Sequence, residues 1–179
     1  QEQTALTGDL KPDKELTEKE TKDLSKKRKS NVVWMNDRWI YKEIHPYIHT
    51  ANANAGWNFE WDFSESCQFT KYKLDQFYDW HCDSWNKPYD KPDDPNTHGK
   101  IRKLSCTVSL SDETEYEGGD FEFDFRNNDD GSNQPQICKE IRPKGSVVVF
   151  PSFVWHRVNP VASGTRYSLV LWNLGWPFK

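Results

Sequence analysis

The sequence lacks several patterns that define whole classes of protein. Its four cysteines form no C-x-x-C pair, which argues against a zinc knuckle and favours reduced structural thiols in a cytosolic protein. No apolar run approaches the roughly 20 residues that cross a membrane. The polar N-terminus carries no signal-peptide pattern. From these absences we expect a cytoplasmic protein that does not bind membranes.

An excess of positive charge is also missing. The formal net charge is −4 at pH 7, so there is no general electrostatic reason to bind nucleic acid. The basic run at residues 26–29 follows acidic residues, and we interpret it as the solvated end of a helix rather than a nucleic-acid patch. Nucleic acid is therefore not an expected partner.

Bulky apolar side chains, by contrast, are plentiful. Aromatic residues make up 15% of the chain and include nine Trp, which excludes a wholly disordered protein. A length of 179 residues without an internal repeat suits one domain with a single core. We predict a charged N-terminal arm or short helix at residues 1–30, a single domain at residues 31–179, and a monomer.

A helical pattern precedes the β-rich part of the chain. Apolar residues recur at helical spacing from Asp37 to Ala51, which predicts one bent helix or two short ones around Pro46, packed against a sheet. His45 and His49 lie four apart in it, but no H-E-x-x-H pattern is present and Pro46 disrupts the intervening turn. We therefore expect no metal at these two histidines.

After Gly56 the sequence changes to short β-type runs with little helix, which argues for an all-β sandwich or barrel. Strands are predicted at residues 58–63, 68–72, 78–83, 101–110, 121–125, 137–141, 146–150 and 165–174. Residues 127–134 are predicted to form a polar loop. The stretch 84–100 contains three prolines and is predicted to be a long loop, either a lid or substrate-binding segment or a disordered connection.

Two potential metal ligands lie in the strand predicted from Tyr78 to Asp83. His81 and Asp83 are two residues apart, so their side chains share one face of a strand while Cys82 points to the other. One imidazole and one carboxylate are two thirds of a facial triad, the ligand set that holds non-haem iron(II) and leaves positions open. His156, shortly after a buried strand, is the leading candidate for the third ligand.

The strand predicted at residues 165–174 carries Arg166, Ser168 and Trp172 on one face. A guanidinium and a hydroxyl inside a small barrel are costly unless they meet an anion, and the planar fork of Arg can grip a carboxylate. A buried structural salt bridge and an anion site both remain open on spacing alone. A three-ligand iron leaves positions for a bidentate 2-oxo acid and dioxygen, and the Arg–Ser pair would hold the second carboxylate of that acid.

Several motifs connect these positions. They are Tyr72, Tyr78-x-x-His81-x-Asp83, Leu104 to Ser111, Tyr116-Glu117-Gly118-Gly119, and Phe150-Pro151 followed by His156-x-Val158 and Gly164-x-Arg166-Tyr167-Ser168. With these motifs the sequence resembles the iron(II)- and 2-oxoglutarate-dependent oxygenases and, within them, the prolyl 4-hydroxylase-like group. The resemblance runs from about Val32 to Lys179, and compact viral and bacterial members are nearest in layout.

The resemblance implies a mainly β fold, a double-stranded β-helix or jelly roll with a few N-terminal helices packed on one sheet. It implies an Fe(II) site made by His81, Asp83 and His156. It further implies 2-oxoglutarate contacts from Arg166, Ser168, Tyr72 and Trp172. For the substrate side we predict Tyr78, Trp80 and Trp85. Ser109 lies where some prolyl hydroxylases carry a cosubstrate-binding Tyr, so that contact is in doubt here.

The activity that the resemblance implies is a dioxygenase that uses O2 and 2-oxoglutarate to hydroxylate an unactivated C–H bond, with release of succinate and CO2 and with ascorbate as a further cofactor. A prolyl residue in a peptide or protein is the expected substrate, and the host cytoplasm the expected location of a viral member. Another side chain, a small molecule or a nucleobase stays open. So do a non-catalytic metal-binding jelly roll and a zinc hydrolase with the same ligands, although a hydrolase gives Arg166 and Ser168 no reason to face inward.

Overall fold

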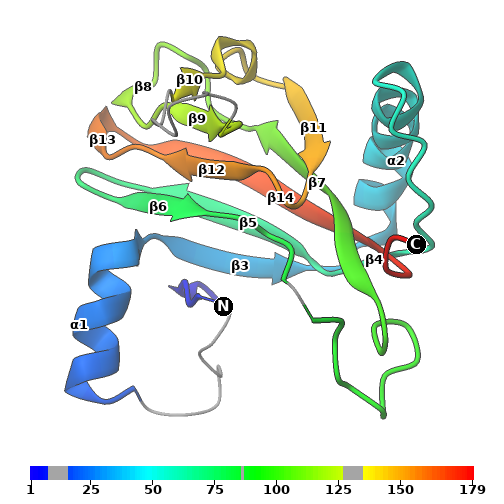
Figure 1. Ribbon diagram of the computed structural model, residues 1–179. Coiled ribbons are helices and arrows are strands. Elements are labelled where there is room, and N and C mark those ends of the chain that lie inside the picture. The colour runs from blue at the N-terminus through cyan, green and yellow to red at the C-terminus, as the bar shows by residue number, and fades with distance from the viewer. Residues whose placement is uncertain (8–15, 86, 127–134) are drawn as a thin grey trace.

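In the computed structural model the described residues are 1–7, 16–85, 87–126 and 135–179 (Figure 1). The loop predicted at residues 127–134 lies outside them. Antiparallel strands form two main sheets and one small pair. The larger sheet contains β1 (Gln3–Thr4), β3 (Asn31–Met35), β4 (Phe63–Ser64), β5 (Cys67–Tyr72), β7 (Ile101–Ser109), β11 (Val147–Pro151) and β14 (Arg166–Gly175).

The second sheet lies across from the first and has the order β10-β9-β12-β6-β2. Its strands are β2 (Arg28–Lys29), β6 (Phe77–His81), β9 (Phe121–Asp124), β10 (Gln136–Ile137) and β12 (Trp155–Val158). The separate pair joins β8 (Tyr116–Gly118) to β13 (Val161–Gly164). The helical elements are α1 (Glu18–Lys27), α2 (Arg38–Asn54) and the 3-10 turn η1 (Lys139–Ile141).

One helix covers the outer face of the larger sheet. Helix α2 continues through Pro46 as a single helix, and its buried Ile40, Ile44 and Ile48 pack in a cluster with apolar residues of β5, β7 and β14. These isoleucines recur at helical spacing, so one stripe of the helix removes apolar surface from water. The prediction of a helix backing the sheet is confirmed.

A second apolar cluster lies between the two sheets. It includes Phe121 and Phe123 of β9, Phe150 of β11, Val158 of β12 and Tyr72 of β5. The face of β14 opposite α2 also points into this space, because successive strand residues alternate between faces. Two sheets that enclose a core, with a helix outside one of them, make the predicted jelly roll.

Three strand predictions differ from the structure. Residues 58–62 form no strand, because the backbone N–H of Phe59 bonds the side chain of Asn52 at 3.0 Å and the aromatic rings of this stretch cover the α2 cluster. The run predicted at residues 137–141 is a two-residue strand followed by η1. The strand predicted to reach Asp83 ends at His81.

The N-terminal segment is attached more closely than the sequence indicates. Strand β1 pairs with β3, and α1 lies against β2 and β6 (Figure 1). The capping box at Thr17 and Glu20 is present. Arg28 is 5% exposed and pairs with Tyr78 across β2 and β6, so its assignment to a solvated helix end was wrong. The domain boundary at residue 30 stays a prediction.

We expect Ile48→Ala to lower the free energy of unfolding by about 2–5 kcal/mol, because the side chain is completely buried and its loss leaves a cavity. The neighbouring Tyr47 is 61% exposed on the same helix, so Tyr47→Ala should change that free energy by about 0.5 kcal/mol or less. Urea unfolding followed by circular dichroism measures both. Similar losses for the two variants would contradict this packing of α2.

No helix in the described part of the chain combines the length and the apolar character needed to cross a bilayer.

Candidate active site

A cavity of about 290 Å3 lies between the two main sheets. The second sheet contributes His81 and His156 to its lining, and the larger sheet contributes Arg166, Ser168 and Trp172. These residues come from distant parts of the chain, and the facing sheets bring them together. The prediction that Arg166, Ser168 and Trp172 share an inward face of β14 is confirmed.

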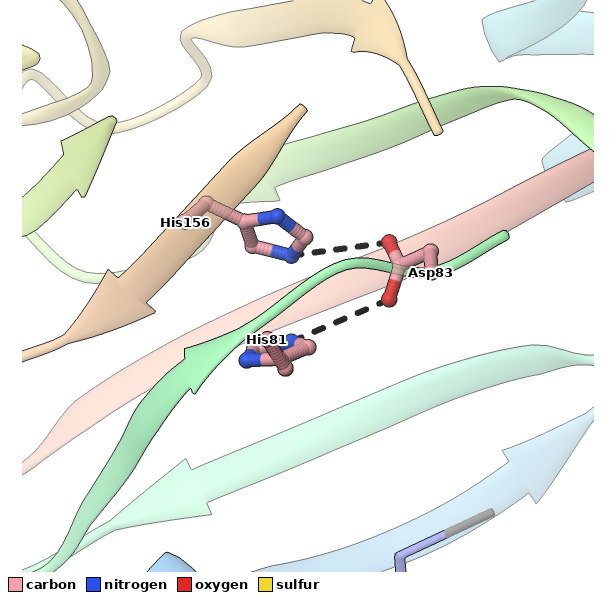
Figure 2. Close-up of side chains that lie close together, drawn as sticks. All are labelled: His81, Asp83 and His156. Atoms are coloured by element: carbon pink, nitrogen blue, oxygen red, sulfur yellow. Dashed lines mark ion pairs between the residues drawn. The ribbon is translucent and has the colours of Figure 1, made fainter. Parts of the chain in front are cut away.

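His81 and His156 are directly opposite each other on β6 and β12. Asp83 comes two residues after His81, just past the end of β6, where its backbone N–H donates to the carbonyl of Ser152 at 2.8 Å. One potential ligand atom from each of these three side chains lies within 4.8 Å of the other two. Figure 2 shows both imidazoles directed toward the carboxylate, with Nε2–Oδ distances of 3.7 Å from His81 and 3.5 Å from His156.

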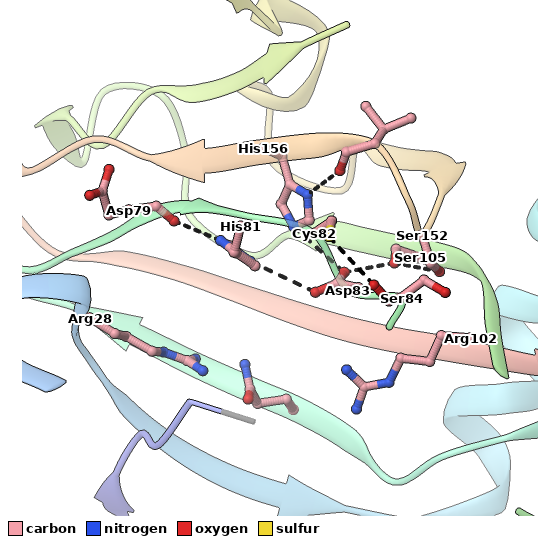
Figure 3. Close-up of polar contacts among 12 residues, drawn as sticks. Arg28, Asp79, His81, Cys82, Asp83, Ser84, Arg102, Ser105, Ser152 and His156 are labelled. Carbon is pink, nitrogen blue, oxygen red and sulfur yellow. Dashed lines mark hydrogen bonds and ion pairs between the residues drawn. The ribbon is translucent and has the colours of Figure 1, made fainter. Parts of the chain in front are cut away.

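Backbone carbonyls fix the orientation of both imidazoles. His81 Nδ1 lies 2.7 Å from the carbonyl oxygen of Asp79, and His156 Nδ1 lies 2.9 Å from that of Val154 (Figure 3). A carbonyl oxygen only accepts hydrogen bonds, so Nδ1 is the donor in each ring. The Nε2 atoms are therefore the ones that face Asp83.

The protonation states of His81 and Asp83 at neutral pH favour cation binding. Burial, followed by the nearby His156, lowers the pKa of His81 to about 3. Burial by itself raises the pKa of Asp83, but charge on His156, His81 and Arg102 and the Ser105 hydroxyl outweigh it and lower the pKa to about 2. At neutral pH His81 is uncharged, and Arg102 and Ser105 still favour the Asp83 carboxylate. A neutral imidazole and a carboxylate are the forms that bind metals.

A hydrogen-bond chain holds the Asp83 carboxylate in place. Ser105 of β7 donates to Asp83 Oδ2 at 2.7 Å and contacts the hydroxyl of Ser152 at 2.9 Å. Such contacts orient a ligand and are typical of metal sites. The cluster thus brings together atoms that carry lone pairs and can bind a metal. Two imidazole nitrogens and one carboxylate suit a divalent first-row metal. The residues fit the Fe(II) that the resemblance implies.

Arg166 also lines this cavity and is almost completely buried. Its Nη1 is 3.4 Å from the hydroxyl of Ser168, and its guanidinium lies 5.5 Å from the ring centre of Tyr72, the residue opposite it on β5. No carboxylate in the described ranges lies within ion-pair distance of Arg166, so a structural salt bridge is not found there. Gly119, at φ +60°, leaves room for this side chain, because a Cβ there would lie 3.2 Å from Arg166 Cδ.

Trp172 packs on a second guanidinium. The Arg102 guanidinium lies 3.9 Å from the Trp172 ring centre and 5.0 Å from that of Trp85. Arg102 Nε donates to Glu65 at 2.5 Å.

Ser109, at the position where some prolyl hydroxylases carry a Tyr, donates to the carbonyl of Ser111 at 3.1 Å. It is not part of the cavity lining.

The predicted substrate residues divide into two groups. Tyr78 and Trp85 line the cavity, and Trp80 does not. A register shift between β6 and β12 pairs Val158 with Tyr78 and His156 with His81, which is a β-bulge that changes the alternation of β6. Tyr78 and His81 consequently stack at 3.5 Å, while Trp80 lies under Arg157 on the other side. Trp80 thus lies outside the cavity lining, and its contact with a substrate stays a prediction.

Cys82 is separate from the ligand group. Its thiol donates to the carbonyl of Ser84 at 3.4 Å, and it is not one of the clustered ligand atoms. The residue lines the cavity, and β6 ends before it, so the strand alternation behind its predicted position on an opposite face does not extend to it.

The stretch 84–100 contains no helix or strand in its described residues but is internally bonded. Tyr89 and Lys100 are joined by a backbone hydrogen bond of 2.9 Å, and the Tyr89 hydroxyl donates to Glu65 at 3.0 Å. A disordered connection is therefore ruled out for these residues. Whether they act as a lid stays a prediction.

Sequence reasoning missed the cavity residues Arg28 and Arg102, and it missed Ser105, which donates to Asp83. For Arg28 the sequence offers no signal, because residues 28–34 show no regular alternation of apolar and polar side chains. Ser105 stands inside one of the motifs, but it contacts Asp83 in a distant segment that only the fold brings close.

Comparisons with known proteins agree with this geometry. Residues 67–173 match the 2OG-Fe(II) oxygenase superfamily. A PKHD-type hydroxylase of Synechococcus sp. (strain CC9902) is 38% identical over 96 residues, which cover 53% of this chain and 35% of that protein. A PKHD-type hydroxylase of Pseudoalteromonas atlantica (strain T6c / ATCC BAA-1087) is 30% identical over 106 residues, covering 59% and 41%. The chain thus spans less than half the length of these curated relatives.

Solved structures share the fold. A viral collagen prolyl hydroxylase from Paramecium Bursaria Chlorella virus-1 has a TM-score of 0.57 at 20% identity and covers 87% of this chain and 84% of that chain. A prolyl-4-hydroxylase from Pseudomonas putida has a TM-score of 0.56 at 20% identity, covering 83% and 71%. The family match includes the ligand cluster and Arg166. The chain therefore belongs to the 2OG-Fe(II) oxygenase superfamily.

Proposed function

We propose that this protein is an Fe(II)- and 2-oxoglutarate-dependent dioxygenase that hydroxylates a C–H bond, with a prolyl residue of a peptide or protein as substrate. One observation supports it above the others. The cavity holds a converging cluster of His81, Asp83 and His156 together with a buried guanidinium, Arg166, that has no carboxylate partner in the described residues.

In this proposal His81, Asp83 and His156 hold Fe(II). When bound, the metal activates dioxygen at the expense of 2-oxoglutarate, which is converted to succinate and CO2. The chain's own part is to keep each Nε2 directed inward through the carbonyls of Asp79 and Val154. Fixed ligands avoid reorganisation during the reaction.

Arg166, Ser168 and Tyr72 would bind the far carboxylate of 2-oxoglutarate. A buried guanidinium costs several kcal/mol unless an anion accompanies it, and the fork of Arg matches a carboxylate. Apolar side chains of Phe150 and Val158 line the same cavity and exclude water from the reacting groups. Trp172, stacked under Arg102, would form the neighbouring wall. A zinc hydrolase would leave Arg166 without a role.

The aromatic lining supports a proline ring as the substrate. Trp34 and Trp85 line the cavity and are 48% and 41% exposed, so they are available at its opening, and Tyr78 lies further in. Aromatic surfaces of this kind accommodate proline rings in extended peptides. The prolyl hydroxylases among the structural neighbours are consistent with that substrate. Ascorbate, a monomeric state and a cytoplasmic location stay predictions.

The test is incubation of the iron(II) protein with 2-oxoglutarate, oxygen and proline-containing peptides. We expect succinate to form together with a peptide that has gained one oxygen atom on a prolyl residue, located by mass spectrometry. A sample without iron is the control. Succinate with oxygen on a different residue would overturn the prolyl assignment alone, and the absence of succinate from folded, iron-loaded protein under all conditions would overturn the oxygenase.

A further inference from the structure

Arg28 differs from the other two arginines that line the cavity. Arg102 is paired with Glu65, and Arg166 is the proposed anchor of the cosubstrate. Arg28 is only 5% exposed, yet no carboxylate of the described residues lies within ion-pair distance of it. Its Nε donates to Ser30 Oγ at 2.9 Å and its Nη1 to the carbonyl of Leu6 at 3.2 Å.

The remaining guanidinium nitrogen of Arg28, Nη2, has no hydrogen-bond partner among the described residues. In the described part of the chain, two buried side-chain polar atoms lack a hydrogen bond, Arg28 Nη2 and Trp172 Nε1. Both residues line the same cavity, and both atoms are donors. A buried donor without a partner costs about 1–3 kcal/mol, and more when it is charged. A ligand with negatively charged acceptor oxygens would compensate this cost.

The position of Arg28 is close to the ligand cluster but separate from it. Its guanidinium lies 4.4 Å from the ring centre of Tyr78, and that ring stacks on His81 at 3.5 Å. One aromatic ring, that of Tyr78, therefore separates Arg28 from the proposed metal ligand His81. In Figure 3 the side chains of Arg28 and Arg102 extend toward each other below His81 and Asp83. An anion held there would lie beside the reacting centre.

Resting on the proposed function, we propose that the substrate carries a carboxylate near the carbon that is hydroxylated, and that Arg28 binds this carboxylate. The contacts to Ser30 and Leu6 orient the guanidinium, which leaves Nη2 for the ligand. In a prolyl substrate such a carboxylate has two sources. It is the C-terminal carboxylate of a short peptide or free amino acid, or the side chain of an adjacent Asp or Glu.

The first test requires no knowledge of the substrate. Wild type and Arg28→Gln are saturated with Fe(II) and 2-oxoglutarate without oxygen, so that the Arg166 site is filled. They are then titrated with acetate, or with acetamide as its neutral match, at constant ionic strength. We expect acetate alone to raise the Tm of the wild type, since binding to the folded state stabilises it, and to have no effect on Arg28→Gln. An equal response of both proteins overturns the proposal.

The second test distinguishes the two sources of the carboxylate. Three short peptides with one proline are compared, one ending in a free carboxylate after the proline, its C-terminal amide, and an amide with Glu beside the proline. Binding without oxygen is followed by the fluorescence of the cavity tryptophans. We expect the carboxylate peptide that fits to bind about 10- to 100-fold more tightly than the plain amide, as charged hydrogen bonds do.

In Arg28→Gln that preference should fall to about twofold or less, and Arg28→Lys should recover part of it because the charge returns without the fork. Equal affinities of the three peptides for the wild type would refute the proposal. The visible band that 2-oxoglutarate produces with the iron(II) protein separates the two hypotheses. If the band forms but the protein shows no preference for acetate or carboxylate peptides, only the role of Arg28 is refuted. If the band does not form, the oxygenase function is refuted.

Discussion

His81→Ala is expected to abolish the visible band that 2-oxoglutarate produces with the iron(II) protein in the absence of oxygen. The band requires metal and cosubstrate in the same site, and His81 supplies one of three converging ligand atoms. Loss of a group that only orients a ligand costs about 10- to 100-fold in affinity or activity. Loss of the ligand itself should lower iron affinity and succinate formation by more than about 100-fold.

A suitable control is His49→Ala. His49 lies on α2, outside the larger sheet, and its ring stacks on Trp61 at 4.6 Å. We expect this variant to keep the band and the iron affinity of the wild type. Anaerobic titration with iron(II), followed by absorbance, measures both proteins. A band of wild-type intensity in His81→Ala would exclude the proposed ligand set.

Arg166→Ala is expected to raise the 2-oxoglutarate concentration that half-saturates the band by about 100-fold or more, while iron affinity changes little. A hydrogen bond to a charged group contributes about 1.5–3 kcal/mol, and an Arg fork makes two of them. Every 1.4 kcal/mol is a tenfold change in affinity. Arg166→Lys keeps the charge without the fork. Its half-saturating 2-oxoglutarate concentration should therefore lie between those of the wild type and Arg166→Ala.

The same substitution tests the salt-bridge alternative. Removing one partner of a buried ion pair destabilises a protein by about 3–5 kcal/mol. Arg166 has no carboxylate within ion-pair distance in the described ranges. We therefore expect Arg166→Ala, without ligands, to lower the free energy of unfolding by clearly less than about 3 kcal/mol. Parallel loss of iron and 2-oxoglutarate binding would contradict the role proposed for Arg166.

The side-chain directions of a long, regular strand could be predicted from the sequence because its residues alternate between two faces. On β14, Arg166, Ser168 and Trp172 face the cavity and Leu169 and Leu171 face α2. Ten consecutive residues in one strand leave a single arrangement that keeps the leucines in the core. The helix of α2 was readable for the same reason, since Ile40, Ile44 and Ile48 form one stripe.

Alternation failed where the backbone is irregular. The bulge in β6 turns Tyr78 and His81 toward the same side and excludes Trp80. The stretch before β4 shows an alternating pattern, but Asn52 takes the hydrogen bond of Phe59 that a neighbouring strand would otherwise make. Both outcomes depend on a partner distant in sequence, which no local pattern contains.

The sequence by itself predicted a β sandwich or barrel and the backing helix from the periodicity of single segments. Its motifs, through the resemblance to the oxygenases, added the jelly roll and the proposed site residues His81, Asp83, His156 and Arg166. Only the tertiary structure decided that the three ligand atoms converge and that Ser105 orients Asp83. It also decided that Arg28, one of four adjacent basic residues, lies buried beside Tyr78. Burial and unpaired donors are properties of contacts between sheets, and such contacts exist only after the chain has folded.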